Sequence, residues 1–324
     1  MRKGIMVAGS VLVDKINVIA AYPKTGELTQ IKEVKRSVGG LVPNVGIDLK
    51  KIAPDLDVYA CGKVGNDAEG DFVKAEFARC GLDTRGLVTD ESEKTSFTDV
   101  MSVAGGERTF FTYAGACARF GADDVDLDAI PAAMLHLGYF LLLDKIDNGD
   151  GVKILKKAKE KGVRTSIDLV SENSDRYRLV LPCLPYTDNL IINEIEGGSL
   201  AGIEPQKENV RKIAETLKKM GVGERVIIHL PEFGACCSDS GYTEIASFSY
   251  PKGYIKGTTG AGDAFCAGAL YGIYNGYSDK EILEFASMAA AISLRAPDAV
   301  SGMVDHDGIR ELCKAFQRRT DVFA

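Results

Sequence analysis

Residues 257–263 (Gly-Thr-Thr-Gly-Ala-Gly-Asp) are the part of this sequence best suited to chemistry, and an apolar stretch from Ala264 to Leu270 follows them. The pattern predicts a glycine-rich turn that opens a helix. A helix start has free N–H groups and the positive end of a dipole, so it can hold an anion. A carboxylate there would repel a phosphate. It makes sense if Asp263 takes a proton from a hydroxyl while the amides receive a transferring phosphoryl group.

Two other interpretations compete for this segment. It could be a plain loop before a helix with an acidic first turn. It could also be a dinucleotide fingerprint, since Asp279 lies about 20 residues downstream. Against the fingerprint, Phe265 stands where its third glycine should be, the next segment is helical, and only about 60 residues remain.

Composition excludes several classes of function. The chain has 324 residues, a net charge of −7 and no large basic cluster, so we expect no nucleic-acid or membrane partner. No apolar stretch is long enough to span a membrane, and the start has no signal-like segment. The eight cysteines show no metal-binding spacing, which favours reduced thiols and a cytoplasmic location. His136 and His229 lie in apolar strand-like runs and are expected to be core residues.

Short β-rich runs alternate with amphipathic helical stretches along the chain. This rhythm predicts a single α/β domain over 1–324, with a mostly parallel central sheet flanked by helices. Insertions at about 15–38 and 95–113 break the rhythm and predict a small β-sheet lid, or else ordinary edge strands. The second insertion reads as a hairpin of Ser96–Val103 and Arg108–Tyr113 around Gly105-Gly106.

Several motifs occur in a fixed order: Gly-Ser-Val-Leu-Val-Asp at 9–14, Gly-Gly-Leu-Val-Pro-Asn at 39–44, Gly-Lys-Val-Gly-Asn-Asp-Ala-Glu-Gly at 62–70, Asn-Glu-Ile-Glu at 193–196, and the turn at 257–263. This set resembles the ribokinase-like, or PfkB-type, carbohydrate kinase family over nearly the whole chain. The resemblance implies an α/β fold with a β-sheet lid, a requirement for ATP and Mg²⁺, and transfer of the γ-phosphate to a sugar or nucleoside hydroxyl.

The resemblance also implies roles in phosphoryl transfer. Asp263 matches the family's catalytic base, and the anion hole is a run of three residues: Gly260, Ala261 and Gly262. Asn193 and Glu196 match the motif linked to magnesium and phosphate, with Glu196 acting on the metal through water. Oxygen ligands suit magnesium. The alternative for Asn193 and Glu196 is a helix start with favourable acids.

On the acceptor side, Asp14 matches the carboxylate that binds sugar hydroxyls. It follows a strand that ends in Gly9-Ser10, so it would lie at a strand's carboxyl end, where open α/β sheets bind ligands. Gly39, Gly40 and Asn44 match the residues that line the sugar pocket, and the alternative is a turn before a helix at Val45. Arg108 would project from the lid hairpin toward the substrate; the alternative is a solvated arginine.

Two motifs depart from the family's pattern. Gly257 stands where the family often has an aspartate of a monovalent-cation site, so activation by a monovalent cation is not expected. His229 and Pro231 replace the threonine and first glycine of a turn that contacts the nucleotide. Pro231 has no backbone donor, so the nucleotide contacts must differ there.

The expected function is ATP-dependent phosphorylation of a monosaccharide such as ribose or fructose. A nucleoside kinase is the alternative within the same fold, since four aromatic residues could stack on a base or else form the core of the lid: Phe97, Phe110, Phe111 and Tyr113. A non-catalytic sugar-binding sensor is a further alternative, which the intact Asp263 disfavours. Pairing of lid sheets would give a homodimer.

Overall fold

The computed structural model describes residues 2–103, 108–172 and 174–323, and the predicted Gly105-Gly106 turn lies outside this part. Nine strands form one sheet. Seven of them pair in parallel, and the last two in the chain form antiparallel pairs at one edge. In spatial order they are β13 (Gly241–Ala246), β12 (Phe233–Ser238), β11 (Arg225–His229), β10 (Asn189–Asn193), β9 (Arg164–Leu169), β8 (Met134–Phe140), β1 (Ile5–Ala8), β4 (Val58–Gly65) and β5 (Asp83–Asp90). The predicted mostly parallel α/β sheet is confirmed.

Helices cover both faces of this sheet, because alternate residues of each buried strand point to opposite sides. In β1, Ile5 and Val7 belong to one apolar core, and Met6 and Ala8 belong to the other. The first core also contains side chains of α1 (Leu41–Ile52), α2 (Ala68–Arg79), α6 (Ala261–Tyr274), α7 (Asp279–Ser293) and α8 (His306–Cys313). The second contains side chains of α3 (Gly151–Glu160), α4 (Glu194–Ala201) and α5 (Val210–Lys219).

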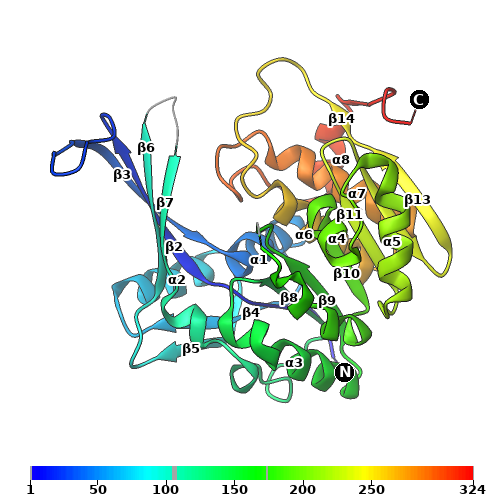
Figure 1. Cartoon of the computed structure of the whole chain (residues 1–324), viewed down its shortest axis with the longest axis horizontal. Coiled ribbons are helices and arrows are strands. Elements are labelled where there is room, and N and C mark those ends of the chain that lie inside the picture. The colour runs from blue at the N-terminus through cyan, green and yellow to red at the C-terminus, as the bar shows by residue number, and fades with distance from the viewer. Residues whose placement is uncertain (1, 104–107, 173, 324) are drawn as a thin grey trace.

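A separate four-stranded sheet, called here the small sheet, projects from this body (Figure 1). Its spatial order is β3 (Ile31–Gly39), β2 (Leu12–Ile19), β6 (Ser96–Val103) and β7 (Arg108–Tyr113). The two insertions that interrupt the α/β rhythm therefore pair with each other, with β2 parallel to β6. A short ribbon of β14 (Phe248–Ser249) and β15 (Gln317–Arg318) completes the strands.

The boundary between the first strand and the small sheet differs from the sequence prediction. The first strand ends at Ala8 rather than Val11, and the small sheet begins at Leu12 rather than near residue 15. Gly9 separates the two strands at φ 147°, and a Cβ there would lie 2.6 Å from the Gly138 carbonyl oxygen. Asp14 therefore lies inside β2 and not at a free strand end.

Helix α1 begins at Leu41, four residues before the predicted start at Val45. Asn44 consequently lies in its first turn. Within the part of the chain that the structure describes, no helix is long and apolar enough to cross a membrane. All eight cysteines are free thiols.

Candidate active site

The start of α6 has the geometry of an anion site. Gly260 precedes it at φ 78°, and a Cβ there would lie 2.4 Å from Ala299 Cβ, so both backbone and space require glycine. The N–H of Ala261 donates to the Thr258 carbonyl at 3.2 Å. Among the described residues nothing accepts from the N–H groups of Gly262 or Asp263, and no side chain caps the helix. These two amides are therefore free to bind a ligand.

Asp263 lies in the first turn of α6, and only 8% of its surface is exposed. Asn44 Nδ2 donates to Asp263 Oδ2 at 2.9 Å, and the Tyr139 hydroxyl donates to both carboxylate oxygens at 3.0 Å. Burial and, second, the charge of Asp168 raise the pKa of Asp263 to about 7, although the two hydrogen bonds act against that rise. A carboxyl group with this pKa can take up a proton near neutral pH.

Asp168, near the end of β9, is a site residue that sequence reasoning missed. Its Oδ1 accepts the Tyr139 N–H at 2.7 Å, and its Oδ2 lies 3.4 Å from His136 Nε2. His136 Nδ1 in turn lies 2.9 Å from Ser166 Oγ, so the prediction of a core histidine is confirmed. The sequence held one usable signal: Asp168 closes a predicted buried strand, where parallel sheets bind ligands.

In the described ranges, one group of side chains comes close enough to share a metal: His136, Asp168 and Cys266. Cys266 Sγ lies 3.4 Å from His136 Nε2. His136 Nε2 contacts both Cys266 and Asp168, so we describe the group as a buried polar network.

A cavity of about 350 Å³ opens beside the start of α6. Its polar lining comes from β8, β9, β10, α4, β11 and α6 and the turns beside them, and consists of Tyr139, Asp168, Ser171, Asn193, Glu196, His229, Gly260, Gly262 and Asp263. Four residues predicted for phosphate and metal binding, Gly260, Gly262, Asn193 and Glu196, therefore share one cavity with Asp263. Ala261 does not line it.

Asn193 and Glu196 sit where β10 runs into α4. They form a capping box, in which Glu196 N–H donates to Asn193 Oδ1 at 2.8 Å and Asn193 N–H donates to Glu196 Oε2 at 3.1 Å. The helix-start interpretation is thus correct, and the same residues also face the cavity. Burial is the main cause that raises the pKa of Glu196 to about 7, with Asp168 and Glu194 adding to it.

Four of the predicted acceptor residues, Asp14, Gly39, Gly40 and Asn44, form a contiguous group on the small-sheet side of Asp263. A Cβ on Gly39 would lie 2.3 Å from Asp14 Oδ2, so glycine leaves room for this carboxylate. Gly40, at φ 92°, starts α1 and turns the chain so that Asn44 reaches Asp263. Burial raises the pKa of Asp14 to about 6. Asp14 does not itself line the cavity.

The structure places Arg108 away from these groups. It is exposed at the start of β7, opposite Ser102, and it does not line the cavity. The aromatic side chains of β7 are also exposed rather than forming a core, since Phe110, Phe111 and Tyr113 keep 61%, 58% and 38% of their surface.

His229, at the end of β11, is not simply the core residue that the sequence suggested. It lines the cavity, and a Cβ on Gly262 would lie 3.4 Å from its Cε1. Its ring centroid lies 4.9 Å from that of Phe265. Burial lowers the pKa of His229 to about 4, so it presents a neutral ring to the anion site.

This fold, with an open helix start beside a buried carboxylate, fits the class of phosphotransferases that act on alcohols. The family model "pfkB family carbohydrate kinase" matches residues 2–306, and the chain belongs to that family. Ribokinase of Arabidopsis thaliana is 26% identical over 316 residues, covering 96% of this chain and 81% of the relative. Fructokinase-1 of Zea mays is 24% identical over 320 residues, covering 93% and 95%.

Among solved structures, Arabidopsis thaliana ribokinase complexed with ribose and ATP matches with a TM-score of 0.83 at 25% identity. The match covers 97% of this chain and 99% of that one. The predicted ribokinase-like fold and family are therefore confirmed, and the chain is an ATP-binding carbohydrate kinase.

Proposed function

We propose that this chain transfers the γ-phosphoryl group of Mg-ATP to a hydroxyl of a monosaccharide of the ribose or fructose type. One observation carries the proposal: Asp263 joins the two halves of the site. Its carboxylate is held by Asn44 on the acceptor side, while its own N–H and that of Gly262 stay free at the cavity.

In the proposed step, the acceptor oxygen forms a bond to the γ-phosphorus as the bond to the β–γ bridging oxygen breaks. The electron pair of that broken bond leaves with ADP, and the acceptor's proton goes to Asp263. The amides of Gly262 and Asp263 stabilise the charge on the equatorial oxygens. Ala261 contributes less, because its N–H already has a partner. Closure of the small sheet as a lid would exclude water from this step.

The residues present fit a magnesium ion. Glu196, Asn193 and Asp168 offer oxygen atoms around the cavity, and no lysine or arginine in the described ranges pairs with either acid. We propose that Glu196 and Asn193 hold Mg²⁺ through water, as hard oxygen ligands do. When bound, the ion would neutralise phosphate charge. The roles of Glu196 and Asn193 remain predictions.

For the acceptor, we propose that Asp14 binds two hydroxyls of the sugar, since a carboxylate accepts several hydrogen bonds. Ribokinase and fructokinase relatives support a sugar rather than a nucleoside. A nucleoside remains the second candidate, because the exposed Phe110 and Phe111 could stack on a base. Arg108 lies at this same exposed edge, and a contact with substrate would require the small sheet to move.

A panel of acceptors tests the proposed function. ADP release would be measured with Mg-ATP and ribose, fructose, other pentoses and hexoses, and nucleosides. We expect turnover with a pentose or ketohexose above the rate without acceptor. Turnover only with nucleosides would replace the proposed acceptor class. Sugar binding without ADP release would support the sensor.

Further proposals concern cations and assembly. A Cβ on Gly257 would lie 2.9 Å from Pro297 Cα, so an aspartate does not fit there, and we propose that no monovalent cation is needed.

The small sheet exposes Ile31, Val34, Phe110, Phe111 and Tyr113. This apolar surface supports a homodimer through the lid. A cytoplasmic location stays a prediction.

A further inference from the structure

The backbone at the end of β8 adopts an unusual conformation. Tyr139, at φ 57°, and Leu141, at φ 78°, are the described residues other than glycine that have positive φ. Side chains with a Cβ disfavour this region, and such strain persists where surrounding contacts impose it, often at functional sites. Here the side chain of Tyr139, one of the two strained residues, reaches Asp263.

Buried acids hold both strained residues in place. Asp168 Oδ1 accepts the Tyr139 N–H at 2.7 Å, and Asp147 Oδ1 accepts the Leu141 N–H at 2.8 Å. Arg176 completes the clamp, because its guanidinium donates to the Leu141 carbonyl at 3.1 Å and pairs with Asp147 at 2.9 Å. The contacts therefore fix the backbone from both sides.

The result of this clamp is the position of the Tyr139 hydroxyl, 3.0 Å from both oxygens of Asp263. We propose that Tyr139 is a positioning residue, which fixes the orientation of the Asp263 carboxylate and stabilises its ionised form for attack by the acceptor. This inference rests on the proposed function, and it adds a residue that no motif of the sequence marks.

The hydrogen-bond capacity of Asp263 leaves room for this role during turnover. A carboxylate offers about four lone-pair sites. Asn44 uses one, and the Tyr139 hydroxyl is shared between the two oxygens, so an acceptor hydroxyl can bind without displacing Tyr139.

The surroundings of Asp263 explain why it needs such a donor. The groups that face it from the packed elements are Asn44 and Asp48 of α1, Tyr139 of β8, Asp168 of β9 and Cys266 of α6, with the neutral ring of His229 at the end of β11. The charge of Asp168 disfavours a further negative charge on Asp263. The hydroxyl of Tyr139 and the amide of Asn44 are the donors that offset this repulsion.

Tyr139→Phe tests the proposal, because it keeps the ring and removes the hydroxyl. Without that donor, Asp263 binds its proton more tightly, so the acidic limb of kcat/KM against pH should move upward by about one unit. At a pH below the acidic limbs of both wild type and variant, this shift is about a tenfold loss of kcat/KM. Much of the rate should return above about pH 8. The KM for ATP should change little.

Tyr274→Phe is the matched control, since its hydroxyl accepts the Gly4 N–H at 2.8 Å at the far end of α6. This variant should leave the acidic limb unchanged. An equal loss of rate for Tyr139→Phe at every pH would overturn the proposal and leave Tyr139 with a packing role only.

A second measurement does not depend on turnover. The ¹³C carboxyl signal of Asp263, assigned by its absence in Asp263→Asn, would be titrated in wild type and Tyr139→Phe. The proposal expects the midpoint to rise in Tyr139→Phe, and equal midpoints would overturn it. A raised midpoint in a protein that phosphorylates no acceptor would contradict the proposed function, while the effect of Tyr139 on the Asp263 carboxyl would stand.

Discussion

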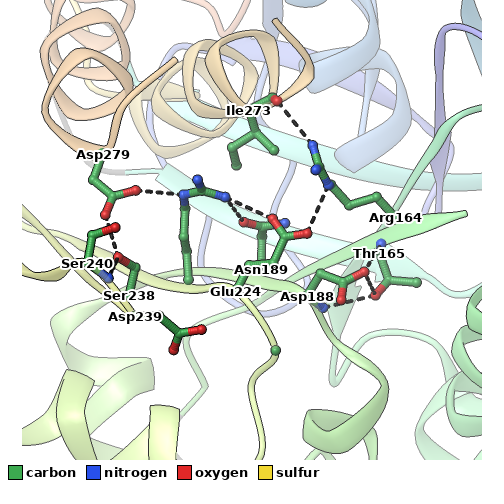
Figure 2. A network of polar contacts seen from close by, with 12 residues as sticks. Arg164, Thr165, Asp188, Asn189, Glu224, Ser238, Asp239, Ser240, Ile273 and Asp279 are labelled. Carbon is green, nitrogen blue, oxygen red and sulfur yellow. Dashed lines mark hydrogen bonds and ion pairs between the residues drawn. The ribbon is translucent and has the colours of Figure 1, made fainter. Parts of the chain in front are cut away.

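The two ends of the parallel sheet treat charge in opposite ways. At the amino ends of β9, β10 and β11, acids are paired with arginines: Arg225 binds Asp279 at 2.7 Å and Glu224 at 2.8 Å, and Arg164 binds Glu224 at 3.0 Å (Figure 2). At the carboxyl ends, Asp168, Glu196 and Asp263 surround one cavity, and in the described ranges none of them pairs with lysine or arginine.

This difference separates the charges that stabilise the fold from those that we propose bind the ligand. The amino-end network is closed, and Ser238 donates to the second oxygen of Asp279 at 2.5 Å. The carboxyl-end acids are buried and have no lysine or arginine partner among the residues that the structure describes, and the pKa values of Asp263 and Glu196 rise to about 7. Folding alone does not favour such a cluster, since buried charges are costly unless paired.

The largest expected effect comes from removing the proposed base. Asp263→Asn should lower kcat by roughly 10²–10⁴, the usual contribution of a general base, while ATP still binds. Steady-state rates and a nucleotide titration would measure both. Near-normal turnover would contradict the role of Asp263.

Asp279→Asn is the matched control for that experiment, since Asp279 also lies in the first turn of a helix but at the opposite end of the sheet. It should lose stability and keep kcat within about twofold, because the Arg225–Asp279 pair stabilises the fold and lies away from the reacting atoms. A loss of kcat comparable to that of Asp263→Asn would erase the contrast between the two ends.

The next effect sharpens the comparison from the amino end. Arg225→Met should lower the free energy of unfolding by about 1–3 kcal/mol, because Asp279 and Glu224 lose a charged donor. Urea denaturation would measure this, and kcat should stay close to that of wild type. An unchanged unfolding midpoint would mean that the network is not structural.

The smallest effect concerns Asp48, a fully buried residue of α1 whose carboxylate oxygens have no hydrogen-bond partner in the described ranges. Burial, and then the charge of Asp263, raise its pKa well above the usual value. The folded state therefore holds this proton more tightly than the unfolded chain. Its contribution to stability is full below about pH 4 and is lost as the pH rises toward the folded pKa.

Asp48→Asn removes this titration. Relative to wild type, the variant should gain stability as the pH rises from about 4 to 8, whatever its absolute stability. Thermal or urea unfolding at several pH values would measure the difference between the two proteins. A difference that stays constant over that range would show that Asp48 keeps its charge in the folded state.

The sequence predicted most of the fold and one half of the site, for identifiable reasons. Asp263 and its glycines are adjacent in the sequence, so a helix start with a carboxylate could be predicted from that segment alone. Asn44 and Glu196 were found only through the ordered family motifs, because α1 brings Asn44 to Asp263 and α4 brings Glu196 to the cavity from far apart in the chain.

Tyr139 could not have been predicted in this way. Its role depends on a positive φ, which sequence signals tie to glycine or asparagine, and on Asp168 from a neighbouring strand. His229 was misjudged because an apolar run predicts burial but does not say that a cavity lies beside the strand's last residue. In both cases the decisive contacts lie at a strand end and are made with residues of other elements.

The most direct test of this account is a structure with magnesium, a non-hydrolysable ATP analogue and the acceptor found by the panel. The account predicts that the γ-phosphate accepts hydrogen bonds from the Gly262 and Asp263 amides, with an acceptor hydroxyl within hydrogen-bond reach of the Asp263 carboxylate. A terminal phosphate bound away from the start of α6, or an acceptor that does not reach Asp263, would contradict it.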